Sequence, residues 1–120
     1  MPNLVHFEIA ADHLDRAVKF YSKVFDWKIR KLDDDDEYFL IDDDDDSGLT
    51  GGLMQRVYPS DSTINTFDVG SINTFARKIT EAGGKVLAPK IALPKLGYVL
   101  YCQDTEGNTF CIMEYDEAAR

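Results

Sequence analysis

His6 and Glu8 are the first residues in the chain whose types and spacing could support chemistry. They belong to the segment LVHFEIA, residues 4–10, in which polar and apolar residues alternate. Such alternation is typical of a β-strand, because successive side chains point to opposite faces of a sheet. We therefore expect Phe7 and Ile9 to face a core, with His6 and Glu8 together on the other face. There the pair could transfer a proton, bind a metal ion or form a structural hydrogen bond.

Cys102 and Cys111 form a second pair of interest. They flank the turn-like segment DTEGN, residues 104–108. A hairpin that turns at Glu106 and Gly107 would place the two cysteines directly opposite each other on one face of the sheet. Two interpretations remain open, namely small residues that fill a core, or a reactive thiol pair, which would need a lowered pKa.

Two runs of aspartates, at residues 33–36 and 42–46, raise the possibility of calcium binding. Calcium sites need oxygen ligands spaced around a turning loop, whereas contiguous carboxylates repel one another and point to water. We therefore interpret both runs as solvated loops.

The composition limits the class of protein. The chain has 120 residues, enough for one domain with its own core. Its 22 acidic and 13 basic residues give a net charge of −9, which disfavours nucleic acid as a partner because phosphates would be repelled. No apolar run approaches the roughly 18 residues that suggest a membrane span, and no signal-peptide pattern opens the chain. We expect a cytoplasmic protein with no membrane partner.

The predicted elements repeat in the two halves of the chain. Apolar residues at helical spacing predict a helix that begins at Asp12 as N-cap. We also expect Phe20 and Phe25 in this helix to be buried. A second helix follows Ser71 as N-cap and ends at the Gly83–Gly84 pair. Strands are predicted at residues 4–10, 27–32, 37–42 and 51–57 in the first half, and at 63–69, 85–89, 97–103 and 109–115 in the second.

Each half therefore has the predicted order β-α-β-β-β. We predict an α+β fold of two such modules, residues 1–58 and 59–120, within a single domain. Each module would form a curved mixed sheet with one face covered by its helix. Packed together, the two modules would form a cup.

Two segments carry a resemblance to a known family, HFEIAADHLDRAVKFYSKVFDWKI at residues 6–29 and DTEGNTFCIMEY at residues 104–115. They resemble the first strand and helix, and the last hairpin, of the vicinal oxygen chelate superfamily, and the likeness extends over the whole chain. This superfamily includes glyoxalase I, bleomycin-resistance proteins, fosfomycin-resistance enzymes and extradiol dioxygenases. The resemblance implies the glyoxalase/bleomycin-resistance fold, and it does not specify an activity.

The resemblance also implies four metal-ligand positions inside the cup, where a divalent metal chelates two neighbouring substrate oxygens. His6 matches the first position and is the one metal-ligand candidate. The other positions fall on Gln55, Ile64 and Cys111, which give at most one amide and one thiol. Such a set suits magnesium, manganese or nickel poorly, because these ions prefer several oxygen or imidazole donors. We therefore expect no metal cofactor, with a zinc, nickel or manganese site as the alternative.

The favoured interpretation is a metal-independent member of this superfamily that binds a small molecule in the cup. The alternatives are a metal-dependent lyase resembling glyoxalase I, or a related enzyme of the superfamily, and a noncatalytic accessory module. Because relatives commonly dimerise, the resemblance also implies a homodimer. The residues expected to contact the ligand are His6, Glu8, Met54, Gln55, Thr66, Tyr101, Cys111 and Met113, and Tyr38 and Tyr98 could line the same pocket.

Overall fold

A computed structural model of the chain describes residues 2–32, 35–42, 49–57 and 62–120. The chain divides into two compact units. The first unit comprises residues 6–64, and the second unit comprises residues 1–5 together with residues 65–120. Most of the two aspartate runs lies outside the described residues, so the solvated-loop interpretation stays a prediction there.

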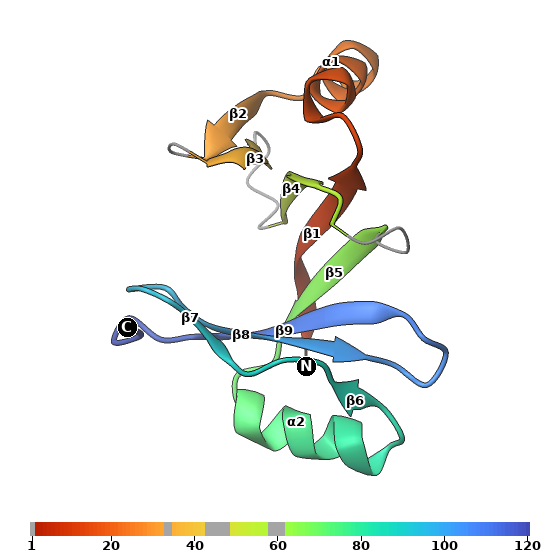
Figure 1. Ribbon diagram of the computed structural model, residues 1–120. Coiled ribbons are helices and arrows are strands. Elements are labelled where there is room, and N and C mark those ends of the chain that lie inside the picture. Colours follow the sequence, from red (N-terminus) through yellow and green to blue (C-terminus); the bar gives the residue numbers. More distant parts are fainter. Residues whose placement is uncertain (1, 33–34, 43–48, 58–61) are drawn as a thin grey trace. The chain divides into compact units, whose positions relative to one another are not determined.

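The described part of the first unit has the element order predicted for the first half of the chain. β1 (Asn3–Ala11) is followed by α1 (Leu14–Phe25), β2 (Ile29–Leu32), β3 (Asp35–Ile41) and β4 (Thr50–Gln55). In the sheet the strands lie in the order β2-β3-β4-β1, with β1 and β4 parallel and the other pairs antiparallel (Figure 1).

The second unit has one short strand more than predicted. β5 (Thr63–Asp68) and α2 (Ile72–Glu81) are followed by β6 (Lys85–Val86), β7 (Ile91–Leu93), β8 (Gly97–Gln103) and β9 (Thr109–Tyr115). The strand order is β5-β9-β8-β6, and β7 also pairs with β8. The predicted strand 85–89 is shorter in the structure, Lys85–Val86, although the backbone N–H of Leu87 still donates a 2.9 Å hydrogen bond to the carbonyl of Tyr101.

Each unit packs its helix on one face of its own sheet. In the first unit the buried core consists of Ala11, Leu14, Ile41 and Leu53, and Phe7 and Ile9 pack against it as predicted. In the second unit the buried core consists of Ile72, Leu100, Cys102 and Ile112, against which α2 packs Phe75, Ala76 and Ile79. The opposite face of each sheet is therefore not covered by the helix of its own unit.

The two helices begin differently. The side chain of Ser71 accepts a hydrogen bond from the backbone N–H of Thr74, so the predicted cap of α2 is confirmed. The predicted Asp12 cap of α1 is wrong. His13 occupies the N-cap position, and Asp12 accepts a 2.7 Å hydrogen bond from Nε of Arg56 instead. Its carboxylate is therefore held by an ion pair with another segment and not by the helix.

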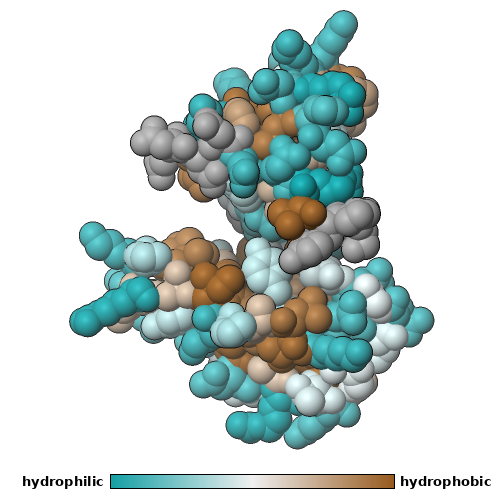
Figure 2. Space-filling view, viewed as in Figure 1, coloured by the Kyte–Doolittle hydropathy of each residue, from teal (hydrophilic) through white to brown (hydrophobic). Residues whose placement is uncertain are grey.

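The prediction that Phe20 and Phe25 are buried is also wrong. The two residues are 57% and 55% exposed, because α1 packs the side that carries Leu14, Ala17, Val18 and Tyr21 against the core. In the described chain only Leu14 of this helix is fully buried. Further large apolar side chains are exposed in both units, and Figure 2 shows apolar residues among hydrophilic ones on the visible surface. Neither helix in the described residues is long and apolar enough to cross a membrane.

Candidate functional site

Four polar side chains on the first unit form one continuous hydrogen-bonded group. Nδ1 of His6 lies 2.6 Å from Oγ1 of Thr50, and Nε2 of His6 lies 2.8 Å from the hydroxyl of Tyr38. The same hydroxyl donates a 2.8 Å hydrogen bond to Oε2 of Glu8. We call the side chains of Thr50, His6, Tyr38 and Glu8 the His6 network.

The strand register places these side chains on one face of the sheet. In the parallel pairing of β1 with β4, His6 is opposite Thr50 and Glu8 is opposite Gly52. Residues paired in this way point to the same face, and the alternation of β1 sends Phe7 to the other face, against the α1 core. The predicted shared face of His6 and Glu8 is therefore present, on the side of the sheet away from α1.

Tyr38 reaches the network because β4 carries a glycine beneath its ring. Tyr38 lies on β3, and a Cβ atom added at Gly52 would collide with the hydroxyl end of its side chain. The neighbouring Gly51 serves the other face in the same way, since a Cβ atom there would meet the ring of Phe7. Two adjacent glycines in one strand thus admit one aromatic ring on each face.

The network is exposed at Thr50 and largely shielded from solvent at His6 and Glu8. The side chain of His6 is 20% exposed and that of Glu8 is 12% exposed. Ala10 is buried and shares their face, as does Met54, which pairs with Ala10 in the sheet. The site is therefore a small polar group within a mostly apolar surface.

The hydrogen atoms of the network can be assigned by counting donors. An ionised Glu8 can only accept, so the single hydroxyl hydrogen of Tyr38 points to it. For a neutral imidazole, the Tyr38 oxygen then accepts from Nε2–H of His6, and Nδ1 accepts from the hydroxyl of Thr50. The bonds therefore run in one direction, from Thr50 through His6 and Tyr38 to Glu8.

This arrangement does not fit the divalent metal that the family resemblance implies. A metal ligand needs a free lone pair on one imidazole nitrogen, and both nitrogens of His6 are engaged. Gln55 cannot join His6, because the strand alternation turns it to the opposite face, where it donates a 2.9 Å hydrogen bond to the carbonyl of Asp12. Within the described residues, no group of three or more His, Cys, Asp or Glu side chains is placed to hold a metal ion.

The ligand-contact residues predicted in the second unit share a face of its sheet. Thr66 pairs with Cys111, Asp68 pairs with Met113, and Cys111 is opposite Tyr101. Thr66, Tyr101, Cys111 and Met113 therefore lie together on the side away from α2. In the first unit the corresponding group is His6, Glu8 and Met54, without Gln55.

The expectation that Cys102 and Cys111 face each other is wrong. Cys111 is opposite Tyr101, and Cys102 is opposite Phe110, so the two thiols point to opposite faces. The reason is the turn, whose five residues 104–108 are centred on Glu106, whereas a two-residue turn was assumed. Asp104 sets this turn by accepting hydrogen bonds from the backbone N–H groups of Glu106 and Asn108.

The two thiols consequently have different surroundings. Cys102 lies in the α2 core, and its burial raises the pKa of the thiol above the ordinary cysteine value. A raised pKa is the opposite of what a reactive thiol needs, so the core-filling interpretation applies to this residue. Cys111 is also buried, on the other face, beside Thr66.

Sequence reasoning missed Thr50 and Gly52 and treated Tyr38 only as a pocket wall. No residue pattern predicts that a tyrosine on one strand will cross a second strand to reach a third. The pair Gly51–Gly52 was the available signal, because glycine inside a strand often marks a close approach by another group.

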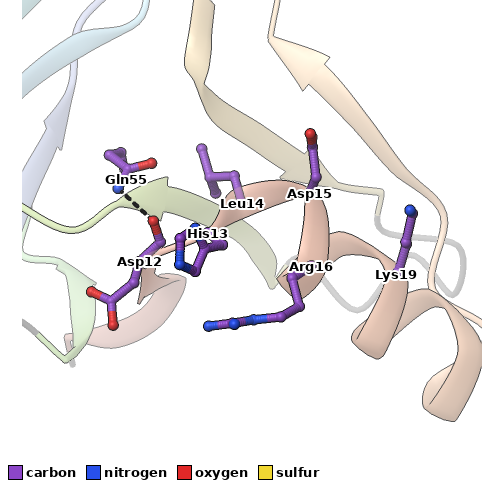
Figure 3. A pocket seen from close by; sticks show the side chains of 7 residues that line it. All are labelled: Asp12, His13, Leu14, Asp15, Arg16, Lys19 and Gln55. Carbon is purple, nitrogen blue, oxygen red and sulfur yellow. Dashed lines mark hydrogen bonds between the residues drawn. The ribbon is translucent and has the colours of Figure 1, made fainter.

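A separate hollow lies at the start of α1 (Figure 3). It has a volume of about 660 Å³. Its lining residues are Asp12, His13, Leu14, Asp15, Arg16, Lys19 and Gln55. Charged side chains of both signs line it, and it does not include any residue of the His6 network.

Comparison with known proteins shows the family and the fold. The family model described as Glyoxalase/Bleomycin resistance protein/Dioxygenase superfamily matches residues 3–112. A superfamily member from Vibrio splendidus 12B01 is 14% identical, with a TM-score of 0.71 over 97% of this chain and 100% of that chain. No curated protein matches the sequence.

Two solved structures of methylmalonyl-CoA epimerase are also similar. The enzyme from Mycobacterium tuberculosis is 15% identical, with a TM-score of 0.68 over 94% of this chain and 87% of that chain. An epimerase in complex with methylmalonyl-CoA and NH4+ is 13% identical, with a TM-score of 0.67 over 99% and 98%. At these identities the likeness shows the fold alone, and it confirms the predicted fold class. Since the family model matches nearly the whole length, the chain belongs to the glyoxalase/bleomycin resistance protein/dioxygenase superfamily.

Proposed function

We propose that this chain binds a small molecule at the sheet face that carries the His6 network, and that it does so without a complete catalytic metal site. The observation that carries the proposal is the continuous chain of hydrogen bonds from Thr50 to Glu8. Ligand sites in proteins are mostly apolar surfaces with a few fixed polar groups that orient the ligand. The face with Ala10, Met54 and the His6 network has this composition.

The polar groups are already held in place before any ligand arrives. Each side chain of the network is restrained by at least one neighbour, so ordering it on binding would cost little conformational entropy. Partial exposure of His6, at 20%, leaves an edge of the imidazole that a ligand can touch. We further expect the protein to act as a cytoplasmic homodimer.

Metal analysis and ligand screening on the purified protein test this proposal. We expect elemental analysis, followed by zinc, nickel and manganese titration, to give far less than one metal ion per chain. Thermal-shift screening would then use CoA thioesters, including methylmalonyl-CoA, together with bleomycin and small aromatic acids. A ligand at a hundredfold excess over its dissociation constant raises the free energy of unfolding by about 2.7 kcal/mol.

Matched histidine variants show whether a ligand uses the proposed site. The chain has two histidines, so His13→Ala is a control for His6→Ala. A ligand of the proposed site stabilises the wild type and His13→Ala equally and loses its effect on His6→Ala. One tightly held metal ion per chain would instead favour the metal-dependent lyase, and the lack of any response would favour the accessory module.

A further inference from the structure

We propose that the Tyr38 hydroxyl takes the place of a metal ion between His6 and Glu8, and thereby keeps divalent metals out of the first unit. The inference rests on the proposed function, since it explains why a family member with a histidine at this position would lack a metal site. It assigns to Tyr38 the role of a specificity-determining residue.

The distances show that His6 and Glu8 are spaced like neighbouring ligands. Nε2 of His6 lies 3.7 Å from Oε2 of Glu8. Two ligands bound to one tetrahedral zinc ion at about 2.0–2.2 Å are separated by roughly 3.3–3.6 Å. A modest movement would therefore let this pair share an ion. Instead, the Tyr38 hydroxyl lies 2.8 Å from both atoms.

The tyrosine also occupies the lone pairs that the ion would need. Whichever atom carries the hydrogen, the bond between Nε2 and the Tyr38 oxygen uses the lone pair or the N–H on that nitrogen. The second nitrogen, Nδ1, is engaged by Thr50 at 2.6 Å. A metal ion would therefore have to break at least one of the two bonds at His6 before that imidazole could bind it.

Gly52 leaves the space in which the Tyr38 hydroxyl lies. A Cβ atom at Gly52 would collide with the hydroxyl end of Tyr38, so any larger residue there would push the ring away from the pair. The position of the Tyr38 hydroxyl between His6 and Glu8 therefore depends on two residues from neighbouring strands, Tyr38 on β3 and Gly52 on β4.

Tyr38→Phe tests the inference by removing only the hydroxyl. Zinc and nickel chloride are titrated against wild type and variant in competition with a chelating dye. We expect at least about tenfold tighter binding by Tyr38→Phe, the lower end of the effects that neighbouring groups have on metal affinity. The double variant Tyr38→Phe/His6→Ala should lose this increase in metal affinity. That loss distinguishes binding at His6 from weak binding by surface carboxylates.

Gly52→Ala provides a second route if Tyr38→Phe folds poorly. It retains the hydroxyl but displaces it, so it should also raise zinc affinity in a manner that His6→Ala cancels. If folded Tyr38→Phe or folded Gly52→Ala binds zinc no more tightly than the wild type, the inference is wrong while the proposed function stands. A tightly bound ion in the wild type would refute the proposed function itself.

Nuclear magnetic resonance of the imidazole nitrogens tests the hydrogen assignment without metal. In a His13→Gln background His6 is the one remaining histidine. We expect the neutral ring in the Nε2–H form, with that hydrogen protected from exchange, and loss of the protection in Tyr38→Phe. A ring in the Nδ1–H form would contradict the proposed direction of the hydrogen bonds.

Discussion

The bond between Tyr38 and Glu8 predicts a measurable coupling free energy. We consider Tyr38→Phe, which removes the donor, Glu8→Ala, which removes the acceptor, and the double variant. The hydroxyl donates to Oε2 over 2.8 Å, and the Glu8 side chain is 12% exposed. Hydrogen bonds to charged groups contribute about 1.5–3 kcal/mol. We therefore expect the two single changes to be non-additive by about 1.5–3 kcal/mol in the free energy of unfolding.

Urea unfolding followed by tryptophan fluorescence measures this coupling in the relevant part of the chain. Trp27 is the single tryptophan, and it packs against the core of the first unit, so its emission reports on that unit. As a control, Tyr38→Phe is combined with Asp12→Ala, whose carboxylate is bound by Arg56 and not by the network. The control pair should be additive within about 0.5 kcal/mol. A Tyr38–Glu8 coupling of the same small size would refute the reasoning, because the two groups would then not be bonded in solution.

Three further predictions concern stability and reactivity. Leu53→Ala should lower the free energy of unfolding, measured in urea, by about 2–5 kcal/mol because the side chain is fully buried. Phe20→Ala should lower it by less than about 1 kcal/mol because Phe20 is 57% exposed. Ser71→Ala should lower the free energy of unfolding by about 1 kcal/mol through loss of the α2 cap, as measured by calorimetry; no change would mean that the cap is dispensable. Burial raises the pKa of Cys102, so the thiol of the unfolded chain loses its proton at a lower pH than the folded one. Stability should therefore fall as the pH rises through the ordinary range of thiol ionisation, and Cys102→Ala should remove that part of the pH dependence.

Much of the fold was predictable from local pattern. Alternation in LVHFEIA predicted that His6 and Glu8 share a face, and helical spacing predicted both helices to within a few residues. These predictions succeed because the side-chain period of a strand or helix depends only on the local backbone. The same reasoning failed for Phe25, since amphipathic spacing identifies an apolar stripe longer than the part that the sheet covers.

The hairpin shows how a small error in a loop changes the chemistry. Moving the centre of the turn by half a residue gives each cysteine a different cross-strand partner, Phe110 for Cys102 and Tyr101 for Cys111. Because strand side chains alternate, that shift sends the two thiols to opposite faces. One thiol then lies in the α2 core, and the prediction of a facing pair is lost.

The sequence by itself determined the family, the order of most elements and the face on which His6 and Glu8 lie, because these follow from motifs and from the local period of each strand and helix. Only the tertiary structure decided that Tyr38 completes the site and that Gly52 makes room for it. The site depends on the register between β1, β4 and β3, which brings Tyr38 within hydrogen-bond distance of His6, 32 positions away in the sequence. Pairing between distant strands is decided by the packing of the whole sheet, and no short stretch of sequence carries that information.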